Sequence, residues 1–181
     1  MFKELYFLTS NKNKAKEAEA ILKRPIKITS KEIKEIQSLD LEEIVYHKVV
    51  DAYKAVKKPV FVEDVGIYIE AWNGFPGPFY RYINECGGPN LLLRMMNSEK
   101  NRNAASKVVV GFHDGEEIHK FIGEVKGKIA NELRGPIKFG WDPVFIPEGY
   151  DKTFSELGPD IKNSISARRI ALNKFKNFLE E

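Results

Sequence analysis

The first sixty residues show apolar positions whose spacing changes from strand-like to helix-like and back. The predicted elements are a strand at 4–9, a helix at 12–23, a strand at 26–30 and a helix at 41–57. Asn11 and Asp40 precede the two helices and can cap them through their side-chain oxygens. Glu43, three residues after Asp40, completes the pattern of a capping box. This part of the chain is therefore predicted to fold as strand, helix, strand, helix.

The rest of the chain mixes alternating segments with loops and further helices. The predicted elements are strands at 60–62 and 67–72, helices at 79–85 and from Pro89 onward, strands at 104–112, 116–130 and 143–146, and a last helix at 162–180. Asp114-Gly115 lies between two alternating segments and predicts a hairpin. This order predicts an α/β fold with a mixed sheet flanked by helices, in two lobes with a central cleft where a ligand can bind. A length of 181 residues fits a single domain spanning 1–181.

Charge and composition exclude several classes of protein. The 29 basic and 26 acidic residues give a net charge of +3, which is too balanced to favour nucleic acid or a membrane surface as a partner. No apolar run approaches the ~20 residues of a transmembrane helix, and none near the N-terminus has the length of a signal core. The single cysteine, Cys86, allows no intramolecular disulfide. We therefore expect a cytoplasmic protein.

The segment from Thr9 to Lys14 is a candidate phosphate-binding site. It lies where a strand leads into a helix, and free backbone amides at a helix start attract anions. The hydroxyls of Thr9 and Ser10, the amide of Asn11 and the ammonium of Lys14 add further hydrogen-bond donors. An ordinary capped surface helix explains the same residues, because this is not a glycine-rich phosphate loop.

Adjacent acids at Glu63 and Asp64 follow the apolar run at 60–62. Neighbouring side chains of a strand point in opposite directions, so we expect one of the two to reach a cleft. Mg²⁺ takes a few carboxylates together with water and substrate phosphates, and Glu35 is a candidate for another carboxylate. The alternative is that these acids are simply solvated.

Two segments of the C-terminal half are candidates for recognising a planar base. Phe139-Gly140-Trp141-Asp142 places aromatic faces around a glycine, and Asp142 can accept from a ring N–H. Core packing of the aromatic rings in a tight turn is the alternative. Lys162 to Arg169, at the expected start of the last helix, can bind phosphate or read a base carbonyl through Arg168. A solvated helix entry explains this segment equally well.

In this order, the motifs resemble those of the inosine/xanthosine triphosphate pyrophosphatase family. The matching residues are Thr9, Asn11 and Lys14; Glu35-Ile36-Gln37; Lys48; Glu63-Asp64; Gly74-Phe75-Pro76-Gly77; residues 139–143; and Lys162, Asn163, Ser166 and Arg168. The resemblance spans essentially the whole chain, and seven motifs in register are jointly specific.

The resemblance implies an elongated α/β fold, a homodimer and Mg²⁺ as cofactor. It implies that Glu35 and Asp64, with Glu63 beside them, hold the metal, and that Asp64 is the base for the attacking water. The residues implied to hold the triphosphate are Thr9, Ser10, Asn11, Lys14, Lys48 and Lys162, with Arg81 as a further basic residue. Phe139, Gly140, Trp141, Asp142 and Arg168 would form the base pocket.

The sequence departs from the family pattern at two positions. Ala167 stands where the family has a histidine beside the base pocket, so base selectivity is looser here if that ring makes a side-chain contact. Val65 stands where the family commonly has Ser or Thr, and this removes one hydroxyl near the metal or phosphates.

The function predicted from these residues is hydrolysis of purine nucleoside triphosphates such as ITP, dITP and XTP to the monophosphate and pyrophosphate. A related nucleotide pyrophosphatase with another base preference is one alternative. The other alternative is a non-catalytic nucleic-acid-binding domain that uses the basic stretch at 12–23, and the balanced charge disfavours it.

Overall fold

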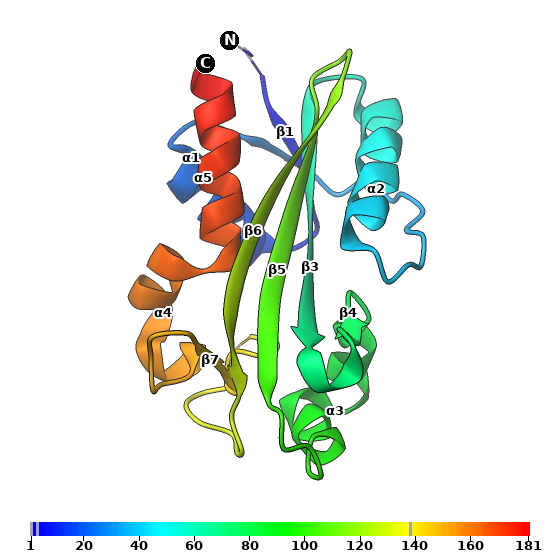
Figure 1. The fold of residues 1–181 in the computed structure, drawn as a ribbon. Coiled ribbons are helices and arrows are strands. Elements are labelled where there is room, and N and C mark those ends of the chain that lie inside the picture. The colour runs from blue at the N-terminus through cyan, green and yellow to red at the C-terminus, as the bar shows by residue number, and fades with distance from the viewer. Residues whose placement is uncertain (1, 3, 138) are drawn as a thin grey trace. The chain divides into compact units, whose positions relative to one another are not determined.

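A seven-stranded sheet organises this computed structural model, which describes residues 2, 4–137 and 139–181 (Figure 1). The elements are β1 (Tyr6–Leu8), α1 (Lys12–Leu22), β2 (Lys27–Thr29), α2 (Leu41–Val56), β3 (Val60–Ile69), a 3₁₀ turn (Glu70–Trp72), β4 (Pro76–Gly77), α3 (Tyr80–Met95), β5 (Asn103–His113), β6 (Ile118–Ile129), β7 (Phe145–Pro147), α4 (Phe154–Ile165) and α5 (Ala167–Glu180). The strand order is β2-β1-β3-β5-β6-β7, and β4 pairs with β3. Strand β1 pairs in parallel with β2 and β3, whereas β4 and β7 are antiparallel to their partners. The predicted mixed α/β fold is confirmed.

The chain divides into two compact units, and three of the strands contribute residues to both. The first unit comprises Met1–Asp64, Val108–Gly123 and Arg168–Glu181, and the second comprises Val65–Lys107 and Glu124–Ala167. Two units agree with the two lobes predicted from the element order. The substrate cleft stays a prediction.

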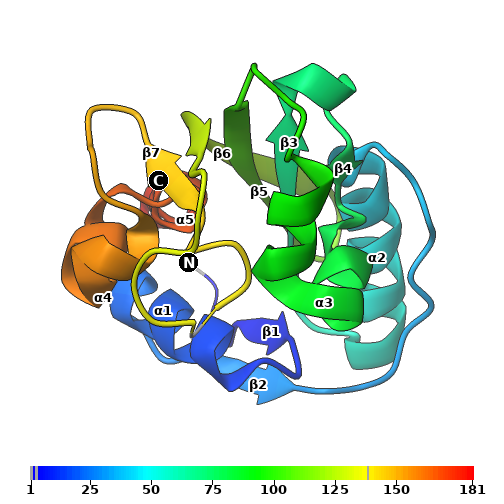
Figure 2. The ribbon, with the colours of Figure 1, turned by 90° about the horizontal axis from the view of Figure 1, so that it is seen from below.

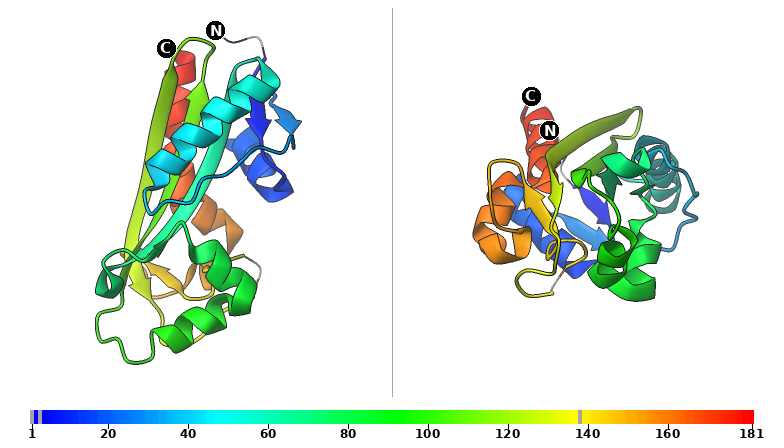
Figure 3. Two further views of the ribbon diagram at one scale, coloured as in Figure 1. Left: turned by 90° about the vertical axis from the view of Figure 1, so that its right-hand side faces the viewer. Right: turned by 60° about the horizontal axis from the view of Figure 1, so that its bottom comes forward.

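In the first unit, helices α2 and α5 pack on opposite faces of the sheet. A side chain on Gly111 of β5 would come within 2.5 Å of Val45 on α2. The ring of the next residue, Phe112, lies 5.0 Å from Phe175 on α5. Because neighbouring residues of a strand point to opposite faces, the two helices cover different sides of the sheet (Figure 3).

The predicted hairpin is confirmed, and Asp114 accepts hydrogen bonds from the backbone N–H groups of Glu116 and Glu117 at its turn.

The second unit has its own apolar core. Its buried members are Ile67, Ile69, Tyr80, Ile83, Leu92, Met96, Ala104, Ile129, Trp141, Val144, Phe145 and Phe154. Helix α3 bends at Gly88, whose φ is 62°, and this agrees with the separate helices predicted at 79–85 and from Pro89 onward. Helix α4 lies beside β7 in this unit (Figure 2). Among the described residues, no helix is long and apolar enough to cross a membrane.

Two predicted element boundaries are wrong in a way that matters for the site. The strands expected at 60–62 and 67–72 are one strand, β3, so Glu63 and Asp64 lie within a strand and not after its end. The helix expected at 162–180 is two helices, because Ser166 is extended (φ −65°, ψ 154°) and separates α4 from α5. Lys162 therefore belongs to the last turn of α4, and Arg168 belongs to the first turn of α5.

The cap of α2 also differs from the prediction. Asp40 accepts from the N–H of Glu42 and caps the helix. Glu43 does not complete a capping box, because its carboxylate accepts a hydrogen bond from the Ser38 hydroxyl. The Asn11 cap of α1 is confirmed, with its side-chain oxygen accepting from the N–H groups of Asn13 and Lys14 at 3.0 and 3.2 Å.

Candidate active site

In the loop between β1 and α1, side chains accept hydrogen bonds from nearby backbone N–H groups. The Thr9 hydroxyl accepts from the N–H of Asn11 at 3.1 Å, and Asn11 in turn caps the helix. The amides of Asn13 and Lys14, which were expected to be free, are therefore already bonded. A phosphate must compete with the Asn11 side chain for them. The first turn of α1, all of whose residues are described, contains no acidic side chain that would repel an anion, and Ser10 is exposed.

Glu63 lies at the centre of a buried ion-pair network in the first unit. Its fully buried carboxylate accepts from Arg168 through Nε at 2.9–3.0 Å and through a terminal nitrogen at 2.9 Å. Lys14 Nζ lies 3.2 Å from the same carboxylate, and Arg168 also contacts Glu17 at 2.6 Å. Burial tends to raise the pKa of Glu63, but the charges of Arg168 and Lys14 outweigh it and lower that pKa to about 2. Glu63 is therefore ionised and held by three cationic contacts.

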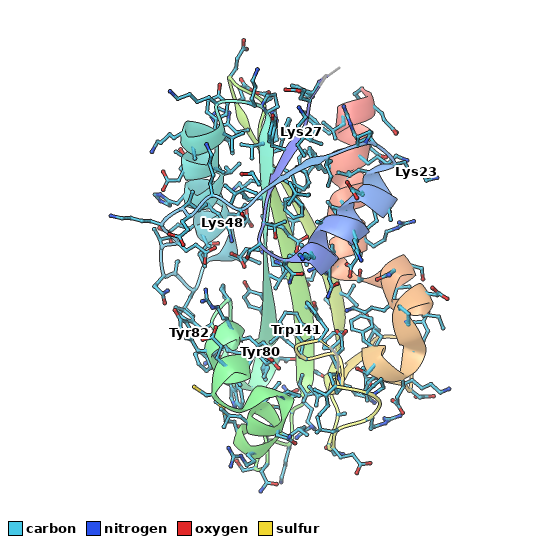
Figure 4. The ribbon with its side chains drawn as sticks, turned by 180° about the vertical axis from the view of Figure 1, so that it is seen from behind. Lys23, Lys27, Lys48, Tyr80, Tyr82 and Trp141 are labelled. Atoms are coloured by element: carbon cyan, nitrogen blue, oxygen red, sulfur yellow. The ribbon has the colours of Figure 1, made fainter. Side chains whose placement is uncertain are left out.

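Asp64, the next residue, belongs to a different cluster around Lys48. Lys48 Nζ, reaching from α2, lies 2.5 Å from Glu35 Oε1 and 3.1 Å from Asp64 Oδ2 (Figure 4). Burial tends to lower the pKa of Lys48, but the charges of Asp64 and Glu35 outweigh this and raise it, so the ammonium stays charged. Two carboxylates from distant parts of the chain thus face one cation, and both remain partly exposed.

This pair of carboxylates fits a magnesium site. Mg²⁺ is usually bound by one or two carboxylates, with waters and substrate phosphates completing its shell. Glu35 and Asp64 supply that number and already face a positive charge. Among the described residues, no group of three or more His, Cys, Asp and Glu side chains could hold a metal ion. Glu63 does not fit, because its carboxylate is fully buried and enclosed by Arg168 and Lys14, whereas the carboxylates of Glu35 and Asp64 are partly exposed.

The second unit brings together part of the predicted base-binding set, namely Phe139, Trp141 and Asp142, whereas Arg168 belongs to the first unit. Lys162 Nζ lies 2.5 Å from Asp142 Oδ2 and 4.4 Å from the centre of the Phe139 ring. Asp142 and Trp141 are buried, and the Trp141 ring packs edge-on against Tyr80 at 4.9 Å. Lys162 was predicted to hold the triphosphate. The structure places it among the base-binding candidates of its unit, and it brings together residues twenty positions apart in the sequence.

The remaining predicted residues are scattered. Val65 is half-buried and packs against the core of the second unit. Arg81 lies on the exposed face of α3, where it pairs with Glu85 at 2.9 Å. Ala167 is buried at the start of α5, and Gly140 has a left-handed φ of 37°.

Two residues of these clusters were not predicted from the sequence. Glu17 contacts Arg168 and lies three residues after Lys14, a spacing that puts both on one face of α1 and was visible in the sequence. Tyr80 contacts Trp141, and none of the sequence motifs contains it.

Comparison with known proteins agrees with the resemblance that the motifs carry. The Ham1 family model matches residues 5–178. A dITP/XTP pyrophosphatase of Thermococcus kodakarensis is 41% identical over 181 residues, covering 98% of this chain and 97% of the relative. The enzyme of the same name from Methanopyrus kandleri is 42% identical over 176 residues, covering 95% and 94%.

Solved structures give the same result for the fold. The Staphylococcus aureus Ham1 protein superposes with a TM-score of 0.86 at 30% identity, covering 98% of both chains. A Ham1 protein from Coxiella burnetii gives 0.87 at 27% identity, covering 99% of both. With a family model matching nearly the whole length and relatives above 40% identity, this chain belongs to the Ham1 family.

Proposed function

We propose that this protein hydrolyses non-standard purine nucleoside triphosphates, namely dITP, ITP and XTP, to the monophosphate and pyrophosphate. Relatives that cover nearly the whole chain are named dITP/XTP pyrophosphatases. The observation that carries the proposal is the meeting of Glu35, Lys48 and Asp64, which puts two carboxylates and a charged ammonium in one place. Hydrolysis of a phosphoanhydride needs charge neutralisation and an oriented water, and these groups can supply both.

We assign the metal site to Glu35 and Asp64. Mg²⁺, when bound there, would neutralise phosphate charge and polarise the phosphorus–oxygen bond. Glu63 is left out of this set, because its carboxylate is enclosed by Arg168 and Lys14. Its role in the proposal is to fix those two cations.

Asp64 is the proposed base. Its carboxylate, oriented by Lys48 at 3.1 Å, would take a proton from the water that attacks the phosphate chain. Lys14 and Lys48 would neutralise charge on the phosphates. Thr9, Ser10 and Asn11 would surround the phosphates at the start of α1, and Arg81 would be a further cation.

The purine would be bound by the aromatic segment of the second unit. Phe139 and Trp141 offer ring faces, Gly140 admits close approach, and Asp142 accepts from the ring N–H of a 6-keto purine. Adenine lacks that N–H, so Asp142 would face a ring acceptor and adenine nucleotides would be rejected. Ala167 would line the proposed pocket, with selectivity loosened by the missing histidine ring. Arg168, which binds Glu63 in the first unit, stays a proposed reader of a base carbonyl.

The proposal includes a single domain, a cytoplasmic location and a homodimer with no nucleic-acid or membrane partner. The balanced charge supports the exclusion of nucleic acid and of a membrane as partners. The single cysteine supports the cytoplasmic location. A pyrophosphatase with a different base preference would use the same catalytic residues. A nucleic-acid-binding domain would not need Glu35 and Asp64 to converge.

A nucleotide panel tests the proposal. Pyrophosphate release is measured from ITP, dITP, XTP, GTP and ATP, each with Mg²⁺ and with excess chelator. We expect turnover of ITP, dITP and XTP that exceeds that of ATP at least tenfold and is lost with the chelator. Turnover of GTP or a pyrimidine nucleotide above ITP would favour the alternative base preference, and absence of any turnover would refute the enzyme.

A further inference from the structure

The Tyr80 hydroxyl is a buried polar group without a hydrogen-bond partner among the described residues. Tyr80 is the first residue of α3, and only 3% of its surface is exposed. A buried donor with no acceptor is destabilising, so such groups are rare in folded proteins. This cost is compensated if the hydroxyl finds a partner in another state of the protein.

The surroundings of Tyr80 identify that partner. Its ring packs edge-on against Trp141 at 4.9 Å, and the two side chains lie together in the second unit (Figure 4). A side chain on Gly140 would touch the same ring at 3.8 Å. The carboxylate of Asp142, the next residue after Trp141, is the anion whose charge acts on Tyr80. That charge, after burial itself, raises the pKa of Tyr80, so the hydroxyl keeps its proton.

Asp142 is held by Lys162. The ammonium lies 2.5 Å from Asp142 Oδ2, and Asp142 is only 6% exposed. A nucleotide brings anionic phosphates and base carbonyls, both of which attract an ammonium. When Lys162 turns to the nucleotide, the Asp142 carboxylate loses a charged partner at a buried position, which is costly unless another donor replaces it.

We propose that Tyr80 is a positioning residue that donates its hydroxyl proton to Asp142 when a purine nucleotide draws Lys162 away. The hydroxyl keeps the Asp142 carboxylate oriented toward the ring N–H of the base. This inference rests on the proposed function, because it takes Asp142 as the acceptor for the purine. It adds a residue that no motif contains.

The test uses Tyr80→Phe, which removes the hydroxyl and keeps the ring. Binding is measured by titration calorimetry with two probes: IMP, which carries the base, and inorganic tripolyphosphate, which does not. We expect the Kd for IMP to rise about tenfold, the effect of losing one hydrogen bond to a charged group, with tripolyphosphate binding changed less than twofold. The melting temperature of the free variant should equal or exceed that of wild type, because the hydroxyl has no partner there.

The matched control is Tyr82→Phe, two residues along the same helix, where the side chain is exposed. It should leave both affinities unchanged. An unchanged IMP affinity in Tyr80→Phe, no IMP binding by wild type, or parallel losses of IMP binding, tripolyphosphate binding and melting temperature would each overturn the inference. Wild type that binds IMP with this Tyr80 dependence but hydrolyses no nucleotide would count against the proposed function alone.

Discussion

The two units hold their charged residues in contrasting ways. In the first unit, carboxylates and cations alternate from Glu17 through Arg168 and Glu63 to Lys14, and a second cluster joins Glu35, Lys48 and Asp64. In the second unit, the ion pair of Lys162 and Asp142 lies among the rings of Phe139, Trp141 and Tyr80.

The contrast between a charge-rich cluster and an aromatic cluster resembles the contrast between the phosphates and the base of a nucleotide. A triphosphate is multiply charged and is recognised by several cations and a metal, whereas a purine is a planar, neutral ring recognised by stacking and one or two directional hydrogen bonds. A charge-rich cluster is therefore suited to binding phosphates, and an aromatic cluster is suited to binding a planar base.

The largest effect is expected from Asp64→Asn in the first unit. The amide cannot accept the proton of water and binds a divalent cation weakly, so kcat for ITP should fall about 10²–10⁴-fold. Asp64 is partly exposed, and the melting temperature should change little. Steady-state kinetics and thermal unfolding check both parts.

Asp51→Asn is the matched control for Asp64→Asn. Asp51 lies on α2 and pairs with Lys54 at the surface. Its replacement should leave kcat within twofold of wild type. A kcat for Asp64→Asn within tenfold of wild type would remove Asp64 from the role of base.

Glu63→Gln should show that the charge network stabilises the first unit. The pKa of Glu63 is about 2 in the folded protein, compared with 4.5 as its ordinary value. A lowered pKa contributes stability that is fully present above pH 4.5 and is lost as pH falls toward 2; the difference corresponds to about 3 kcal/mol. Urea unfolding with chelator present should find the variant less stable by about that amount at pH 6, with the gap closing toward pH 2.

A constant gap between Glu63→Gln and wild type across that range would contradict this explanation. In that case the loss would come from packing and not from the charge. Glu85→Gln is a suitable control, because Glu85 pairs with Arg81 on an exposed helix face and should shift stability by less than about 0.5 kcal/mol.

Local patterns predicted most of the fold correctly. The caps at Asn11 and Asp40, the hairpin turn at Asp114 and the break at Gly88 all depend on neighbours within a few residues, and each has a recognisable residue type. The continuous strand β3 was missed because two acids and a glycine interrupt its apolar pattern. Tertiary contacts from α1, α2 and α5 satisfy those acids, and local sequence does not reveal such contacts.

The candidate site was predicted as a set of residues but not as two clusters. Glu63 and Asp64 are adjacent in sequence, but neighbouring side chains of β3 point in opposite directions. Glu63 therefore contacts Arg168, whereas Asp64 contacts Lys48. Lys162 was assigned to phosphate from its motif alone. Its contact with Asp142 depends on how α4 packs, and no spacing rule gives that.

The division between the units is tested most finely by comparing Lys14→Ala with Lys162→Ala. Lys14 neighbours Glu63 in the charge-rich cluster, so its loss should weaken tripolyphosphate binding about tenfold and IMP binding less. Lys162 lies over the Phe139 ring beside Asp142, so its loss should weaken IMP binding by a similar factor and tripolyphosphate binding less. Titration calorimetry with the two probes gives a crossed pattern if each cluster recognises one end of the substrate. Equal losses of tripolyphosphate binding in both variants would return Lys162 to the phosphate-binding role that the family motif implies, because a cation that served the base alone would leave a base-free ligand unaffected.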